Sequence, residues 1–150
     1  MINKCKTREN TDHNKKLVKA YSRIQLLIDE LNKKEIPDQI ATSINSQIKL
    51  LDSFEGSEKD LTRFIKKTCA KILELVKKEL GLVAKHYYQN LWMAIGISAF
   101  GMPFGILWFV VLQNPAFIAI GLPLGLPIGM AIGIQKDKKA KEENKQLQID

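Results

Sequence analysis

Side chains that could do covalent or metal chemistry are few in this chain and lie far apart. The histidines, His13 and His86, and the cysteines, Cys5 and Cys69, have no spacing that is typical of a metal or redox site. No Ser-His-Asp or Cys-His arrangement is present, and the glycines follow no strand-to-helix turn that could cradle a phosphate. The carboxylates alternate with lysines, which is typical of a solvated surface. The sequence therefore predicts a protein that is not an enzyme and uses no cofactor or metal.

The most regular pattern is a set of four glycines, named here the glycine ladder: Gly121, Gly125, Gly129 and Gly133. A four-residue spacing places them on one ridge of a helix, where glycine lets another helix backbone approach closely. An earlier segment offers a matching face of small residues: Ala94, Ser98, Gly101 and Gly105. The ladder could pack within its own chain or between copies, and spacing alone leaves both open.

The ladder lies in a segment, residues 91–134, that contains no Asp, Glu, Lys, Arg or His. Two apolar spans, 91–112 and 116–134, are separated by the polar turn Gln113-Asn114-Pro115. At ~1.5 Å per residue the spans are roughly 33 and 28 Å long, which suits a bilayer core about 30 Å thick. Because the turn is so short, the sequence predicts a transmembrane helical hairpin.

Aromatic and cationic residues flank these spans. The predicted interfacial anchors are Tyr87, Tyr88, Trp92, Trp108, Lys85 and Lys136. Lysines lie beyond both outer ends of the hairpin and are absent from its turn, so the positive-inside rule predicts that both termini are cytoplasmic. A polar N-terminus without the apolar core of a signal peptide agrees with this orientation. We expect a protein of the inner (cytoplasmic) membrane that meets anionic headgroups at its cytoplasmic face.

The first 90 residues hold 18 Lys or Arg against 12 Asp or Glu and predict a basic region outside the membrane. Three helical patterns follow one another, starting at Thr11 or Asp12, at Pro37 and at Ser57, each with one apolar stripe. A glycine cap is expected at Gly56 and a capping box at Ser57 and Asp60. Helices with single stripes fit a three-helix bundle within one chain, and they equally fit a coiled coil shared between copies.

The predicted fold class is all-α, with a cytoplasmic bundle or coiled coil of three helices before a two-span transmembrane hairpin. The predicted divisions are a disordered N-terminus (1–10), a cytoplasmic helical domain (11–81), an interfacial junction (82–90), the hairpin (91–134) and a charged cytoplasmic tail (135–150). The lysines are spread among acids and few aromatics accompany them, so no nucleic acid is expected as a partner.

Three stretches carry a resemblance: LWMAIG in the first span, GLPLGLPIGMAIG in the second, and the tail DKKAKEENKQL. With these, residues 91–147 resemble a loose group of small bacterial membrane proteins with two glycine-rich spans, which are known as glycine-zipper proteins. The resemblance implies a two-span topology and no particular function. The helical part from residue 12 to residue 80 lies outside it.

Two functions from different classes remain open. The favoured hypothesis is a non-enzymatic, membrane-anchored interaction or assembly subunit that forms homo-oligomers through its glycine ladder. In that hypothesis the helices of residues 12–80 also offer a surface to a protein partner that the sequence does not identify. The alternative is a pore-forming or membrane-permeabilising effector, suggested by the proline-broken, glycine-rich spans. Against the alternative, the hairpin has no charged pore lining and Ser98 is its one polar group in mid-span.

Overall fold

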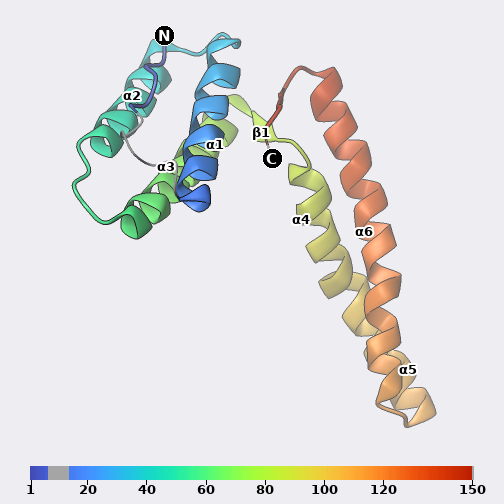
Figure 1. Cartoon of the computed structure of the whole chain (residues 1–150). Coiled ribbons are helices and arrows are strands. Elements are labelled where there is room, and N and C mark those ends of the chain that lie inside the picture. Colours follow the sequence, from blue (N-terminus) through green and yellow to red (C-terminus); the bar gives the residue numbers. More distant parts are fainter. Residues whose placement is uncertain (7–13, 150) are drawn as a thin grey trace. The chain divides into compact units, whose positions relative to one another are not determined.

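The computed structural model describes residues 1–6 and 14–149, apart from the side chain of Leu122. The described chain is mostly helical and has five helices when the consecutive segments α4, η1 and α5 are counted as one (Figure 1). The two long apolar helices come last, which confirms the predicted helical class. The chain divides into two compact units, one made of residues 1–84 with the segment from Leu147 onward, the other of residues 85–146.

The first unit contains α1 (Lys15–Asn32), α2 (Asp38–Asp52) and α3 (Glu58–Leu80), and α3 packs against both other helices. Apolar residues three and four apart form one stripe on each helix, and burial of these stripes against one another drives the packing. The stripes meet in a single core, whose largest fully buried members on these helices are Leu17, Ile24, Leu27, Ile28, Leu31, Ile44, Ile48, Leu61, Ile65 and Ile72.

Helix α1 begins after a different cap from those expected. The side-chain oxygen of Asn14 accepts hydrogen bonds from the N–H groups of Lys16 at 3.2 Å and Leu17 at 3.3 Å. These bonds satisfy two of the N–H groups that every helix N-terminus leaves without a partner. The expected caps, Thr11 and Asp12, lie outside the described residues.

The end of α2 corrects a second expectation. The helix stops at Asp52, so Gly56 does not cap it. The ring of Phe54 stacks on Phe64 with 4.7 Å between centroids, and it lies so close to Gly56 that a Cβ atom there would be 2.6 Å from the ring. The glycine therefore makes room for an aromatic contact.

Helix α3 has the ends that the sequence predicted. The Ser57 hydroxyl accepts a hydrogen bond from the Asp60 N–H at 3.2 Å, which confirms Ser57 as the N-cap. The same hydroxyl donates to the Asp60 carboxylate at 2.6 Å, in place of the backbone bond that Asp60 would accept in a capping box. At the other end Gly81 adopts a left-handed conformation with φ of 68°. Glycine carries no Cβ penalty in that conformation, so it ends the helix at little cost.

The first six residues are packed, so the prediction of a disordered N-terminus is wrong for them. The Ile2 N–H donates to the Asn32 side chain at 2.9 Å, and the Lys6 N–H donates to Asp52 at 3.0 Å. Ile2 and Cys5 are buried in the core. These contacts come from residues 30 or more positions away, so local sequence could not show them. Residues 7–10 lie outside the described residues.

The last residues also correct the prediction, because they are part of the core and not only a charged tail. Strand β2 (Gln146–Leu147) pairs with β1 (Val83–Ala84) in a two-stranded sheet. Leu147 and Ile149 are 0% and 1% exposed, and Leu82 and Val83 of the expected interfacial junction are buried as well. The Gln148 N–H donates to the Glu30 carboxylate at 2.9 Å. Leu82, Leu147 and Ile149 thus belong to the core of the first unit.

The second unit contains α4 (Tyr87–Gly96), the π-helical turn η1 (Ile97–Gly101), α5 (Met102–Leu112) and α6 (Ala116–Glu142). Residues 87–112 and 116–142 form helices of 26 and 27 residues that are long and apolar enough to cross a membrane. They begin four residues before the first predicted span and end eight residues after the second. Helix α6 packs along α4, η1 and α5 in the opposite chain direction (Figure 1).

Candidate functional site

The glycine ladder faces the backbone of the other apolar helix. All four ladder glycines are buried. A Cβ atom at Gly133 would lie 2.5 Å from Cα of Gln89, far closer than side-chain carbons approach backbone atoms. Cβ atoms at the other three ladder positions would run into the carbonyl oxygens of Gly101, Gly96 and Trp92. Only glycine therefore fits at these positions while the two backbones stay in contact.

The opposing face of this contact contains a glycine that the sequence analysis missed. Gly96, Gly101 and Gly105 are all buried against α6, and a Cβ atom at Gly105 would lie 2.7 Å from the Ile118 carbonyl oxygen. Gly96 and Gly101 are five residues apart, and the π-helical turn η1 lies between them. Because a π-turn inserts one extra residue into an α-helix, it brings these two glycines onto one face.

The π-turn also explains why the predicted face was wrong in its first half. Ala94 and Ser98 are exposed, and the atoms nearest to the ladder glycines belong to other residues of the opposing helix. The Ser98 hydroxyl instead lies 3.0 Å from the Ala94 carbonyl oxygen and 3.2 Å from that of Ile95, as expected for a serine that bonds to its own helix. A count in steps of four or three from Gly101 toward the N-terminus assumes α-helix throughout and therefore lands on the wrong residues.

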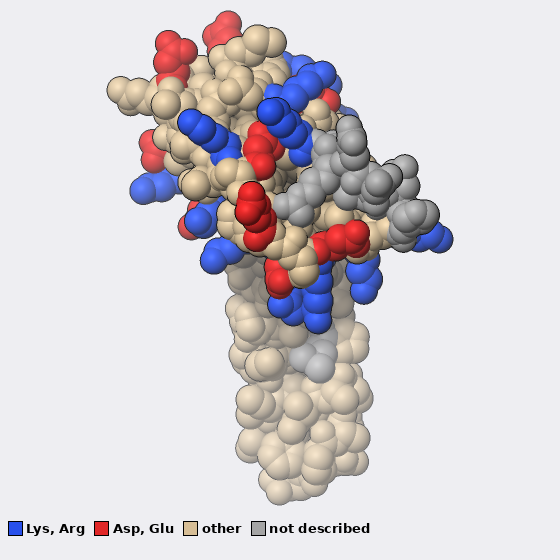
Figure 2. Space-filling view, turned by 60° about the vertical axis from the view of Figure 1, so that its left-hand side comes forward, with Lys and Arg blue, Asp and Glu red and all other residues tan. Residues whose placement is uncertain are grey.

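Away from the ladder, both apolar helices expose large hydrophobic side chains. The most exposed on α5 are Leu107, Val110 and Val111, and Ile120 and Leu124 are exposed on α6. The visible face of this helix pair shows no Lys, Arg, Asp or Glu along most of its length (Figure 2). A core helix of a soluble protein would bury such side chains, whereas lipid tails leave them in a favourable environment.

The buried ridge of α6 continues one step beyond the ladder and ends in a carboxylate. Asp137 lies four residues after Gly133 and is 7% exposed. Its two oxygens accept hydrogen bonds from the N–H groups of Tyr88 at 3.0 Å and Gln89 at 2.9 Å. These groups belong to the first turn of α4, where N–H groups lack helical partners and the helix dipole favours a negative charge. Asp137 therefore caps α4 from the neighbouring helix.

No residue of α4's own sequence provides this cap. The residue before the helix, His86, has a left-handed conformation with φ of 60° and makes no side-chain bond to the first turn's N–H groups. The sequence did contain a signal for Asp137, because this residue continues the four-residue spacing of the ladder. The spacing alone does not show that Asp137 is a cap, because that role depends on the backbone of α4 lying along the ridge.

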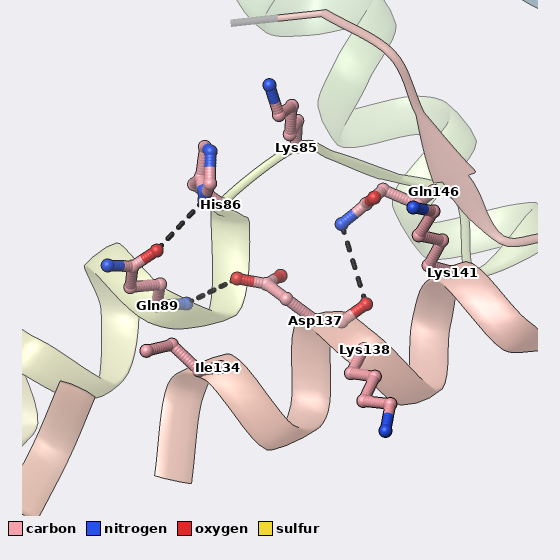
Figure 3. Close-up of a pocket in the computed structure, with 8 residues that line it drawn as sticks. All are labelled: Lys85, His86, Gln89, Ile134, Asp137, Lys138, Lys141 and Gln146. Atoms are coloured by element: carbon pink, nitrogen blue, oxygen red, sulfur yellow. Dashed lines mark hydrogen bonds between the residues drawn. The ribbon is translucent and has the colours of Figure 1, made fainter. Parts of the chain in front are cut away.

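A cavity of about 480 Å³ opens beside Asp137 (Figure 3). Its lining comes from the start of α4 and the charged end of α6, and consists of Lys85, His86, Gln89, Ile134, Asp137, Lys138, Lys141 and Gln146. A ring nitrogen of His86 is hydrogen-bonded to the Gln89 side chain at 2.9 Å. The Gln146 amide makes a long hydrogen bond of 3.5 Å to the Asp137 carbonyl oxygen. The cavity therefore combines three lysines with one carboxylate that is already bonded to backbone N–H groups.

The predicted interfacial anchors occupy both ends of the helix pair. The ammonium group of Lys136 lies 5.4 Å from the ring centroid of Trp92, within the range of a cation–π contact. Tyr87 and Tyr88 are half-buried and meet edge to face at 5.2 Å. Lys85 lines the cavity, and Trp108 is exposed near the far end of α5. The amphipathic rings thus lie near the ends of the uncharged segment, where headgroups would meet it.

The two cysteine thiols are buried. Burial raises the pKa of the Cys5 thiol to about 12, with a further contribution from Asp52, and burial raises that of Cys69 to about 11. Such thiols stay protonated and are poor nucleophiles. Nowhere in the described part of the chain do three His, Cys, Asp or Glu residues come together as a metal ion would need.

Comparison of the chain with protein-family models, with curated protein sequences and with solved structures finds no match. The resemblance to glycine-zipper proteins therefore stays a prediction.

Proposed function

We propose that this protein is a non-enzymatic integral membrane protein, and that it serves as a membrane-anchored interaction or assembly subunit. The observation that carries the proposal is the helix pair of residues 87–142. Its tight contact is made by the glycine ladder, while its large apolar side chains point outward. In water this arrangement would leave an extended hydrophobic surface exposed, and in a bilayer the same surface meets lipid.

In the proposed architecture, α4–α5 and α6 form a transmembrane hairpin, and α1, α2 and α3 form a three-helix bundle within one chain. Contacts of α3 with both α1 and α2, and the burial of their apolar stripes in a common core, support the bundle over a coiled coil between copies. The proposed location is the inner membrane, with both termini on the cytoplasmic side. The proposed partners are the bilayer and a protein that docks on the helices of residues 12–80.

Self-association through the glycine ladder is proposed in a restricted form. Within one chain the ladder is already covered by α4, η1 and α5, so it can join two copies only if α6 of one copy pairs with these segments of another. Such an exchange preserves every glycine contact and changes only the chain that supplies it. We propose that homo-oligomers form by this exchange.

The pore-forming alternative gains no supporting observation. A water-filled pore needs a polar lining. Between Leu91 and Ile134 the polar side chains are Ser98, Gln113 and Asn114, and the last two belong to the turn between the helices. Since the Ser98 hydroxyl is engaged with its own helix, the described faces provide no row of polar groups across the helix pair.

Membrane residence and topology are tested together on the full chain. The protein should stay in the membrane fraction after an alkaline carbonate wash, and reporter fusions should place residue 1 and Asp150 in the cytoplasm and Asn114 outside it. Release by the wash would overturn the membrane proposal. A C-terminal fusion that is active only on the outer side would overturn the hairpin.

Self-association is tested by amine cross-linking of the full chain in membranes. The variant Gly125→Leu/Gly129→Leu should lose cross-linked oligomers while inserting normally, because leucine inserts readily but holds the two backbones apart. The matched control is Ala119→Leu/Ala131→Leu, which makes the same kind of change at two exposed positions of α6. Oligomers that survive in the first variant would show that copies do not associate through the ladder.

A further inference from the structure

The cavity beside Asp137 has a charge that the proposed function does not by itself explain. Lys85, Lys138 and Lys141 line it, and the carboxylate of Asp137 is its one acidic lining group. Both oxygens of that carboxylate are bonded to N–H groups of α4's first turn, whose dipole partly offsets the negative charge. The residues that line the cavity therefore carry an excess of positive charge.

The ion pair of Lys138 weakens the charge of that lysine only slightly. Lys138 lies 3.9 Å from Glu142, and both side chains are largely exposed, so the attraction is screened by water. Lys138 and Lys141 are three residues apart on α6 and thus share one face, whereas Lys85 comes from the segment before α4. Figure 3 shows the lining side chains of both segments, and in that view Lys85 and Lys138 extend in opposite directions on either side of Asp137.

The cavity also lies where the apolar and the charged parts of the helix pair meet. Ile134, which lines it and is 48% exposed, is the last residue of the uncharged segment, and Lys136 is the first charged residue after it. At about 480 Å³ the cavity falls within the range of about 300–1,000 Å³ that is usual for small-ligand sites. A ligand bound here would contact lysines at one end and an apolar side chain at the other.

We propose that this cavity binds the headgroup of an anionic phospholipid, with the side chains of Lys85, Lys138 and Lys141 turning toward its phosphate and the first part of an acyl chain against Ile134. The inference rests on the proposed membrane function, since it takes the lipid from the bilayer around the helix pair. Basic pockets between membrane helices on the cytoplasmic side are a recurring kind of lipid site. A soluble anion would use the lysines but would gain nothing from Ile134.

The test is native mass spectrometry of the full chain in nonionic detergent, titrated with dioctanoyl-phosphatidylglycerol. The variant Lys138→Gln/Lys141→Gln should need about tenfold more lipid for the first bound molecule, because each lysine contributes to the attraction. The control Lys139→Gln/Lys145→Gln removes the same charge from the same unit at positions outside the cavity lining, and it should bind within about twofold of the parent. Equal weakening in both variants would show diffuse attraction and overturn the proposal.

Two further arms identify the source of the phosphate. Dioctanoyl-phosphatidylcholine should bind about tenfold more weakly than the anionic lipid, and inorganic phosphate at equal concentration should not displace that lipid. Displacement by inorganic phosphate, or equal binding of the two lipids, would overturn the proposal. A chain that leaves the membrane in a carbonate wash would refute the proposed function itself. A chain that stays there but shows no preference for the anionic lipid would refute only this inference.

Discussion

Asp137 accepts a hydrogen bond from the backbone N–H of Gln89 at 2.9 Å, across 48 positions of sequence. The contact joins the first turn of α4 to the last buried position of the α6 ridge that carries the glycine ladder. A contact made by glycines joins backbone to backbone and has few interdigitating side chains. Two helices can therefore slide against one another there at little cost. A carboxylate bonded to two consecutive N–H groups fixes the register of the pair at one end.

Replacing Asp137 with alanine should therefore loosen the start of α4. The N–H groups of Tyr88 and Gln89 would lose their acceptor, and loss of a helix cap typically costs about 1 kcal/mol. Hydrogen exchange of these two amides in the full chain should become roughly fivefold to tenfold faster. The control Glu142→Ala removes an exposed carboxylate from the same helix and should leave both amides unchanged. Equal exchange in parent and Asp137→Ala would contradict the capping role.

Leucine at Gly96 should destabilise the helix pair, whereas leucine at Ser98 should not. A Cβ at Gly96 would collide with the backbone of Gly125, and Ser98 is exposed. Both tryptophans of the chain, Trp92 and Trp108, lie in this unit, so their fluorescence during an SDS titration reports on the pair alone. Gly96→Leu should unfold at a lower SDS fraction by at least about 1–2 kcal/mol. A larger effect of Ser98→Leu would favour the uninterrupted α-helix that the sequence suggested.

Truncating Leu147 or Ile149 to alanine should open the first unit. Both side chains are fully buried, and such truncations typically cost about 2–5 kcal/mol. In a Cys5→Ser background, labelling of the buried Cys69 thiol reports on this opening and should become about 30-fold faster or more. The control Gln148→Ala changes an exposed side chain between them whose backbone N–H remains. Unchanged labelling in Leu147→Ala would mean that the tail is dispensable for the core.

The hydrogen bonds that the Glu30 carboxylate accepts from Lys33 and from the tail should make stability depend on pH. The Glu30 carboxylate accepts a hydrogen bond from the Lys33 ammonium at 2.6 Å and another from the Gln148 N–H. These two bonds, the first more than the second, hold the pKa of the Glu30 carboxyl below its ordinary value near 4.5. A carboxyl with a lowered folded-state pKa stabilises the fold above its unfolded pKa, and this contribution disappears as the pH falls through the folded pKa.

The thermal midpoint of the full chain should therefore exceed that of Glu30→Gln at pH 7, and the gap should close below about pH 4.5. Circular dichroism in nonionic detergent gives the midpoints. The control Asp29→Asn removes the exposed carboxylate next in sequence, and it should show a smaller gap at pH 7. A gap between parent and Glu30→Gln that stays constant from pH 7 to pH 3 would contradict this role of the charge.

The sequence by itself determined the features that depend on residues close together in the chain. Spacings of a few residues account for the stripes of α1 to α3, the N-cap at Ser57, the glycine end at Gly81 and the two long apolar helices. The ladder's ridge was also set by spacing alone, because α6 stays helical through Pro123 and Pro127.

Only the tertiary structure decided which distant segments meet. The π-turn η1 moved Gly96 onto the packing face and left Ser98 outside it, since one extra residue in a turn rotates everything before it. Asp137 became a cap once α4 lay against its ridge, and Leu147 and Ile149 became core once the chain's end returned to residues 1–84. Two apolar residues in a charged tail are too few to show a periodic pattern. The partners that bury them are more than 60 positions away, so the local sequence does not indicate their burial.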